Sequence, residues 1–137
     1  MNNTRFTTAV HVLTLLAYEG DDAVTSEYIA GSVNTNAVVI RRILADFREA
    51  GLVSSRRGPG GGWLLERPAD AITLADVYRI VEAQPLFPLH TNPPNPACPV
   101  GLHIQSVLEA RFDRARQALL AELDRTTVAD LLADIPD

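Results

Sequence analysis

The chain has 137 residues, 47% of them hydrophobic and 6% aromatic, with a formal net charge of -5. This length suits one domain, or one small domain with an accessory helix, and the apolar content excludes a disordered or low-complexity chain. The single cysteine, Cys98, excludes an internal disulfide framework and fits a reducing cytoplasm. The apolar run over residues 9–18 is interrupted by polar side chains and followed by acids, so we expect neither a signal peptide nor a membrane span.

Charge is unevenly distributed along the chain. Residues 36–67 contain six arginines and three acids, whereas the segments before and after them are net acidic. Phosphate contacts are local, because screening at physiological salt limits them to a Debye length of about 8 Å. The basic block is therefore able to bind nucleic acid although the whole chain is acidic.

The N-terminal part is predicted to contain three helices. Apolar residues at helical spacing predict one helix over residues 6–19 and a short one over residues 26–33. Residues 34–36 form the next connection, and Asn36 is the natural N-cap of a third helix that runs to Ala50. Two helices joined by such a short turn form a helix-turn-helix.

A two-stranded ribbon is predicted next. Residues 52–57 and 63–67 have the pattern of strands, and the glycine-rich segment 58–62 joins them. Its glycines permit positive φ angles and the close approach of a partner, which is typical of the wing of a winged helix. A phosphate-cradling nucleotide loop is not favoured, because no Lys-Ser/Thr pair follows the glycines and no helix begins there.

The C-terminal half is predicted to be helical apart from one proline-rich segment. Thr73 caps a short helix that extends to Val81, and five prolines over residues 84–97 prevent a continuous helix there. A long helix over residues 100–124 and a short one capped by Thr127 follow. The long helix would span roughly 37 Å, too much for a small head to cover, so a second copy of the chain is the expected cover.

The expected fold is mainly α, a winged helix-turn-helix head with a two-stranded wing plus a long C-terminal dimerisation helix. We expect a head domain over residues 1–83, a proline-rich linker over 84–98 and a helical dimerisation region over 99–137. The head contains the basic block and is therefore the part expected to bind DNA.

A resemblance to a known family is carried by residues 41–77, RRILADFREAGLVSSRRGPGGGWLLERPADAITLADV. This stretch is similar to the Rrf-two (BadM-type) family of bacterial winged helix-turn-helix transcriptional regulators, and the family's elements cover nearly the whole chain. The resemblance implies a homodimer joined through the long helix, with one recognition helix per subunit in the major groove. It also implies that the recognition helix opens at Asn36 and Val38, and that Arg57 is a wing arginine near the minor groove.

The candidate DNA-binding residues lie on the third helix and on the ribbon. We expect Asn36 to be both a helix cap and a neighbour of phosphate, although its capping role alone would explain it, and Thr35 is similar. Arg57 lies next to a wing tip without acids, whereas Arg56 points to the other face of its strand. The full set is Thr35, Asn36, Val38, Arg41, Arg42, Arg56, Arg57, Gly58 and Gly60.

The arginines of the third helix also have a plainer interpretation. Arg41 and Arg42 could be solvated helix surface, with Asp46 as an intrahelical partner of Arg42 worth about 0.2–0.5 kcal/mol. Arg48, one turn from the helix end, is typical of a surface charge.

The best-known members of the resembled family hold an iron-sulfur cluster through three cysteines in the loop before the long helix. This chain has only Cys98 there, so we expect no cluster and no other cofactor. Residues 93–101 are instead similar to a cluster-free branch of the family.

Cys98 has two interpretations. A thiol at a helix N-terminus feels the helix dipole and becomes more acidic, which suits a redox switch; alternatively it is a small buried apolar group or a helix N-cap. His90 and His103 flank Cys98, but without a fourth ligand they do not predict a metal site. Catalysis by Cys98 with His103 as base is not expected, because their spacing places them on different faces of a helix.

These features predict a cytoplasmic, homodimeric, DNA-binding transcriptional regulator, a repressor that reads a palindromic site and is not an enzyme. A response to an oxidant or a small molecule through the Cys98 region stays open, and no membrane partner is expected. The alternative is a winged-helix protein-interaction module that binds no DNA, which the acidic total charge permits.

Overall fold

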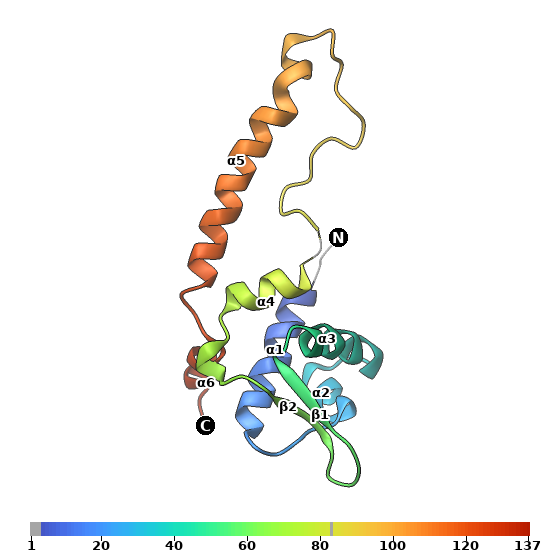
Figure 1. Cartoon of the computed structure of the whole chain (residues 1–137), viewed down its shortest axis with the longest axis vertical. Coiled ribbons are helices and arrows are strands. Elements are labelled where there is room, and N and C mark those ends of the chain that lie inside the picture. The colour runs from blue at the N-terminus through green and yellow to red at the C-terminus, as the bar shows by residue number, and fades with distance from the viewer. Residues whose placement is uncertain (1–3, 83) are drawn as a thin grey trace.

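The computed structural model describes residues 4–82 and 84–137 of the chain. A helical head carries a two-stranded ribbon, and one long helix projects from this head (Figure 1). The expected mainly α, winged helix-turn-helix fold is confirmed. In chain order the elements are α1 (Arg5–Glu19), α2 (Ser26–Val33), α3 (Ala37–Glu49), β1 (Val53–Arg56), β2 (Gly62–Leu65), the short 3-10 helix η1 (Ala69–Ala71), α4 (Leu74–Val81), α5 (Pro99–Leu123) and α6 (Val128–Asp134).

Helices α2 and α3 are joined by the short turn that the sequence predicts. Asn34 ends α2 in the left-handed conformation, with a φ of 65°, and its N–H donates to the carbonyl of Ala30. The side-chain oxygen of Asn36 accepts the N–H of Val39 and so caps α3 as expected. Local hydrogen bonds at both ends of the turn therefore determine where α3 begins.

The core of the head lies where α1, α2 and α3 pack together. Each of these helices buries one apolar stripe, and residues that follow them in the chain, such as Leu52, Ile72 and Val77, complete the core. The largest fully buried side chains are Phe47, Leu13, Leu16, Ile29, Ile40, Ile43, Leu44, Leu52, Ile72, Val12, Val77 and Val128.

Strands β1 and β2 form an antiparallel ribbon in which Arg56 lies opposite Gly62. Strand β1 ends one residue before the expected limit, because the glycine-rich tip begins after Arg56. Strand β2 begins at Gly62, which was expected in the loop but pairs with Arg56, and it ends at Leu65 rather than at residue 67. Arg57 consequently belongs to the tip, and its direction does not follow from strand alternation.

The outer edge of the ribbon is held by the connection between α1 and α2. The N–H of Trp63 donates to the carbonyl of Val24 at 2.7 Å, and the N–H of Val24 donates to the carbonyl of Trp63 at 3.2 Å. A two-stranded ribbon is marginally stable alone, so this third segment supports the wing.

The C-terminal half leaves the head and then returns to it. Residues 84–98 run beside α5 to its N-terminal end, and α6 lies against α1 (Figure 1). Val128 of α6 is buried in the core of the head. The domain limits stay a prediction, and the one after residue 83 falls on a residue outside the described ranges. None of the described helices is long and apolar enough to cross a membrane.

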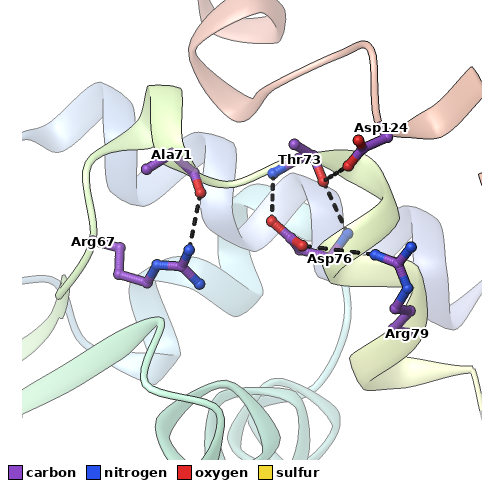
Figure 2. Close-up of polar contacts among 6 residues, drawn as sticks. All are labelled: Arg67, Ala71, Thr73, Asp76, Arg79 and Asp124. Atoms are coloured by element: carbon purple, nitrogen blue, oxygen red, sulfur yellow. Dashed lines mark hydrogen bonds and ion pairs between the residues drawn. The ribbon is translucent and has the colours of Figure 1, made fainter. Parts of the chain in front are cut away.

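A polar cluster fastens the C-terminal end of α5 to the start of α4 (Figure 2). The Thr73 hydroxyl donates to Asp124 at 3.2 Å and accepts the N–H of Asp76 at 3.1 Å. The Asp76 carboxylate in turn accepts the N–H of Thr73 at 3.0 Å, which completes a capping box. Arg67, just after β2, donates to the carbonyl of Ala71 at 3.2 Å. The end of the long helix is therefore joined to the segment that follows the wing.

Candidate nucleic-acid interface

The start of α3 presents apolar and polar groups to solvent. Val38 lies in the first turn with 52% of its surface exposed, although the neighbouring Ile40 is fully buried. Asn36 is exposed and Thr35 is half-buried. The Asn36 oxygen is used by the cap, whereas its amide nitrogen has no hydrogen-bond partner among residues 4–82 and 84–137. A methyl-bearing side chain and an amide donor are thus available to a partner molecule.

Arg41 is held by an acid of the preceding helix. Its guanidinium donates to Glu27 in the first turn of α2 at 2.6 Å. The pKa of Glu27 lies below its usual value because a backbone hydrogen bond, and then the Arg41 guanidinium, stabilise the carboxylate. The pair links the two helices of the helix-turn-helix. Both side chains are exposed, so a DNA phosphate is able to replace Glu27 as the partner of Arg41.

Arg42 is exposed and makes no ion pair within the described part of the chain. The plainer interpretation gave it Asp46 as a partner, but Asp46 instead pairs with Arg5 of α1. This pair bridges α1 and α3, and a rule based on neighbouring helix positions does not detect it. Arg42 is therefore the arginine of α3 that remains available to a phosphate.

Arg48 is exposed, and its guanidinium lies over a ring at the base of the wing. Its guanidinium carbon is 5.5 Å from the centroid of the Trp63 ring. This contact was missed in the sequence, where Arg48 has the pattern of an ordinary surface charge. The available signal was a lone tryptophan, Trp63, at the start of the second strand.

The wing carries two further exposed arginines, Arg56 and Arg57. No described acid forms an ion pair with either of them. Gly58 and Gly60 are exposed in the same tip, with φ angles of 89° and 73°. Arg42, Arg56 and Arg57 therefore provide three unpaired cations on α3 and on the ribbon that directly follows it.

The backbone geometry of the tip requires glycine at Gly61 and Gly62. A Cβ at Gly61 would lie 2.2 Å from the carbonyl oxygen of Arg56. A Cβ at Gly62 would lie 2.4 Å from the carbonyl oxygen of Val24, and the φ of Gly62 is 147°. The close approach of the ribbon to Val24 therefore depends on the absence of a side chain at Gly62.

Gly62→Ala is expected to lower the free energy of unfolding by more than about 1 kcal/mol and to weaken DNA binding. The added methyl group collides with Val24, so the ribbon has to shift at its base. Thermal unfolding measures the loss, with Gly60→Ala as the control because its φ is 73° but no atom lies within 4 Å of its Cβ. Equal effects of the two substitutions would contradict the role of the close approach.

Cys98 lies far along the chain from this surface, at the N-cap position of α5. Its side chain is exposed and makes no capping hydrogen bond. The interpretation of Cys98 as a buried apolar group is therefore wrong, and its thiol does not act as a cap. An exposed thiol is accessible to small oxidants.

The fold and the arginine-bearing surface define a winged-helix DNA-binding protein. A family model described as "Rrf2: Iron-dependent Transcriptional regulator" matches residues 2–134. The chain belongs to the Rrf2 family, which confirms the resemblance seen in residues 41–77.

Individual relatives agree with this family membership. The protein YwnA of Bacillus subtilis (strain 168) is 42% identical over 133 residues, which are 96% of this chain and 97% of YwnA. The HTH-type transcriptional regulator CymR of the same strain is 30% identical over 88% of this chain and 80% of CymR. A solved structure of CymR, described as the global cysteine regulator of B. subtilis, covers 99% of this chain and 98% of its own, with 27% identity and a TM-score of 0.72. This chain is therefore a DNA-binding transcriptional regulator, in preference to a protein-interaction module.

The family description mentions iron, and the donors of this chain do not fit an iron-sulfur cluster. Cys98 is its one cysteine, so a set of three thiolates is not available. Within the described ranges, no three His, Cys, Asp or Glu side chains are grouped so that they could hold a metal ion.

Proposed function

We propose that this regulator is a homodimeric repressor that reads a palindromic site in double-stranded DNA. The observation that carries the proposal is the set of three exposed, unpaired arginines, Arg42, Arg56 and Arg57, on two consecutive elements of the head. Local positive charge of this kind neutralises phosphates whatever the total charge of the chain. A transcriptional regulator has to reach chromosomal DNA, so we assign this protein to the cytoplasm.

Different residues position the head and read the sequence. Arg42, Arg56 and the amide of Asn36 contact phosphates, and Arg41 joins them when a phosphate replaces Glu27. Thr35 and Val38 lie at the end of α3 that enters the major groove, where a valine methyl group is able to contact the methyl of thymine. Arg57 enters the minor groove, and the absence of side chains at Gly58 and Gly60 lets the tip approach the backbone.

Dimerisation would use the exposed side of α5. Val100 and Val107 are 67% and 54% exposed and lie on one face of this helix, seven residues apart. A second α5 packed on this face would place two heads symmetrically, and two symmetric heads read an inverted repeat.

A signal near Cys98 would act on the same helix. Cys98 is at the free end of α5, whereas the opposite end is joined to the head through Asp124 and Thr73 (Figures 1 and 2). A change in how two long helices pack would therefore alter the spacing of the heads. The signal is either an oxidant that modifies the thiol or a small molecule that binds beside it.

Cys98→Ser is expected to bind operator DNA like the wild type but to lose any change in binding on treatment with peroxide. Peroxide converts the thiol to a sulfenic acid and is reduced to water, and serine has no equivalent reaction. Operator affinity is measured before peroxide, after peroxide and after reduction by a thiol. A response of the same size in Cys98→Ser would exclude Cys98 as the sensor.

Selection of bound fragments from a random pool of double-stranded DNA tests the proposed function. We expect enrichment of an inverted repeat whose half-sites are one helical turn apart, about 34–36 Å, or a multiple of that distance. Repeating the selection after peroxide treatment tests the signal separately. A pool that shows no enrichment, or only a single half-site, would contradict a dimeric sequence reader.

A further inference from the structure

At the base of the wing, three segments of the head meet at one residue, Trp63. The Trp63 backbone is hydrogen-bonded to Val24 on one edge of β2, and Trp63 pairs with Ser55 of β1 on the other. The half-buried indole packs against the core of the head. The Arg48 guanidinium, from the last turn of α3, lies over its ring at 5.5 Å.

We propose that Arg48 is a positioning residue that holds the wing at a defined angle to the recognition helix by stacking on Trp63. This inference rests on the proposed role of the wing in DNA binding. It assigns Arg48 no contact with DNA, in contrast to Arg42 and Arg57.

The position of Arg48 on α3 supports this assignment. Arg48 follows Val38 by ten residues, about 15 Å along the helix axis, so it lies at the end away from the proposed base-reading turn. Arg41 and Arg48 are seven residues apart and therefore share a face of α3. Both contact neighbouring elements, Arg41 through Glu27 of α2 and Arg48 through Trp63 of β2.

The short ribbon needs such a support. Each strand has four residues, and an isolated two-stranded ribbon of this size is marginally stable. Trp63 follows Gly62, which is the cross-strand partner of Arg56, and Arg57 comes next in the tip. A small rotation at Trp63 therefore displaces both wing arginines. If the positioned wing is only part of the population, the apparent affinity for DNA falls by that fraction.

Arg48→Met removes the guanidinium and keeps an aliphatic stem of similar length. We expect the affinity for the selected operator to fall roughly two- to fivefold, the range of a cation–π contact at an exposed site such as Arg48. The slope of log affinity against log salt should not change, because no phosphate contact is lost. Loss of one phosphate contact would instead reduce the magnitude of that slope by about 0.9. Arg125→Met is the matched control. Arg125 is an exposed arginine in the turn after α5, and it pairs with Glu122 in the last turn of that helix.

A double-mutant cycle distinguishes an effect of Arg48 that acts through Trp63 from a direct contact between Arg48 and DNA. In a Trp63→Leu background, Arg48→Met should cause no further loss of affinity, because the ring on which Arg48 acts is absent. Trp63→Tyr keeps an aromatic face and should retain most of the affinity. An undiminished effect of Arg48→Met in the Trp63→Leu background would overturn the proposal.

The fluorescence of the free protein supplies a readout that does not need DNA. Trp63 is the one tryptophan of the chain, so tryptophan emission reports on the surroundings of this one ring. Arg48→Met should change the emission spectrum, because the cation over the ring is removed, whereas Arg125→Met should not.

The two readouts distinguish failure of this inference from failure of the proposed function. A wild type that binds no DNA overturns the proposed function and the inference with it. A wild type that binds, together with an Arg48→Met variant of full affinity or unchanged emission, overturns the inference alone.

Discussion

Arg57→Ala is expected to bind the operator roughly 5- to 150-fold more weakly than the wild type, a loss of about 1–3 kcal/mol. Arg57 is exposed at the start of the wing tip, and no described acid neutralises it. An arginine in a narrow minor groove gains from the concentrated negative potential there, and alanine retains none of that interaction. The measurement is a titration of labelled operator at physiological salt.

Two controls make the Arg57 result specific. Arg125→Ala removes the same charge from the turn between α5 and α6, on the opposite side of the head from the ribbon tip (Figure 1), and should change affinity little, because surface charges act over about a Debye length of 8 Å. Arg57→Ala should also reduce discrimination among operators that differ in minor-groove width. Unchanged affinity at physiological salt would exclude Arg57 as the wing contact.

Val107→Glu is expected to dissociate the proposed dimer and to reduce operator affinity by about 10²–10⁴-fold. Val107 is 54% exposed on the face of α5 to which we assign the second copy. In a symmetric dimer the substitution would place two carboxylates in an apolar contact, where an unpaired charge is unfavourable. Each monomer would then bind one half-site without the gain from a linked second head.

Sedimentation of the free protein and operator titration together test this expectation. Gln105→Glu is the matched control, because it adds the same charge on nearly the opposite side of α5. We expect Val107→Glu to sediment as a monomer and Gln105→Glu as a dimer. A Val107→Glu variant that remains dimeric would mean that a different surface joins the subunits.

Features governed by local rules could be predicted from the sequence. Asn36, Thr73 and Thr127 were expected as N-caps, and each side chain accepts a backbone N–H from the first turn of its helix. The long α5 followed from an uninterrupted segment after Pro99. Such signals extend over a few residues, which is why the order of the helices and the ribbon agreed with the structure.

Contacts between distant residues could not be predicted in the same way. Arg5 pairs with Asp46 and Arg41 with Glu27, and nothing in the spacing of these charges selects one partner over another. The bridge from Val24 to Trp63 depends on how the first connection of the head lies beside the ribbon. These pairings changed the candidate site, because Arg41 is held by Glu27 whereas Arg42 makes no ion pair with a described acid.

The position of α6 illustrates the same limit. Its apolar residues predicted a helix, which we grouped with the long helix in the dimerisation region of residues 99–137. In the structure α6 lies against α1 and buries Val128 in the core of the head, while α5 projects away from it (Figure 1). An amphipathic pattern shows that a face is buried without identifying the surface that buries it.

The ratio of affinities for the selected operator and for a scrambled duplex of equal length is the most direct test of the central claim. At physiological salt we expect the operator to be bound at least about 10³-fold more tightly, with both affinities decreasing as salt increases. Equal affinities for the two duplexes, or binding that salt does not weaken, would contradict a winged head that positions itself on phosphates and reads base sequence.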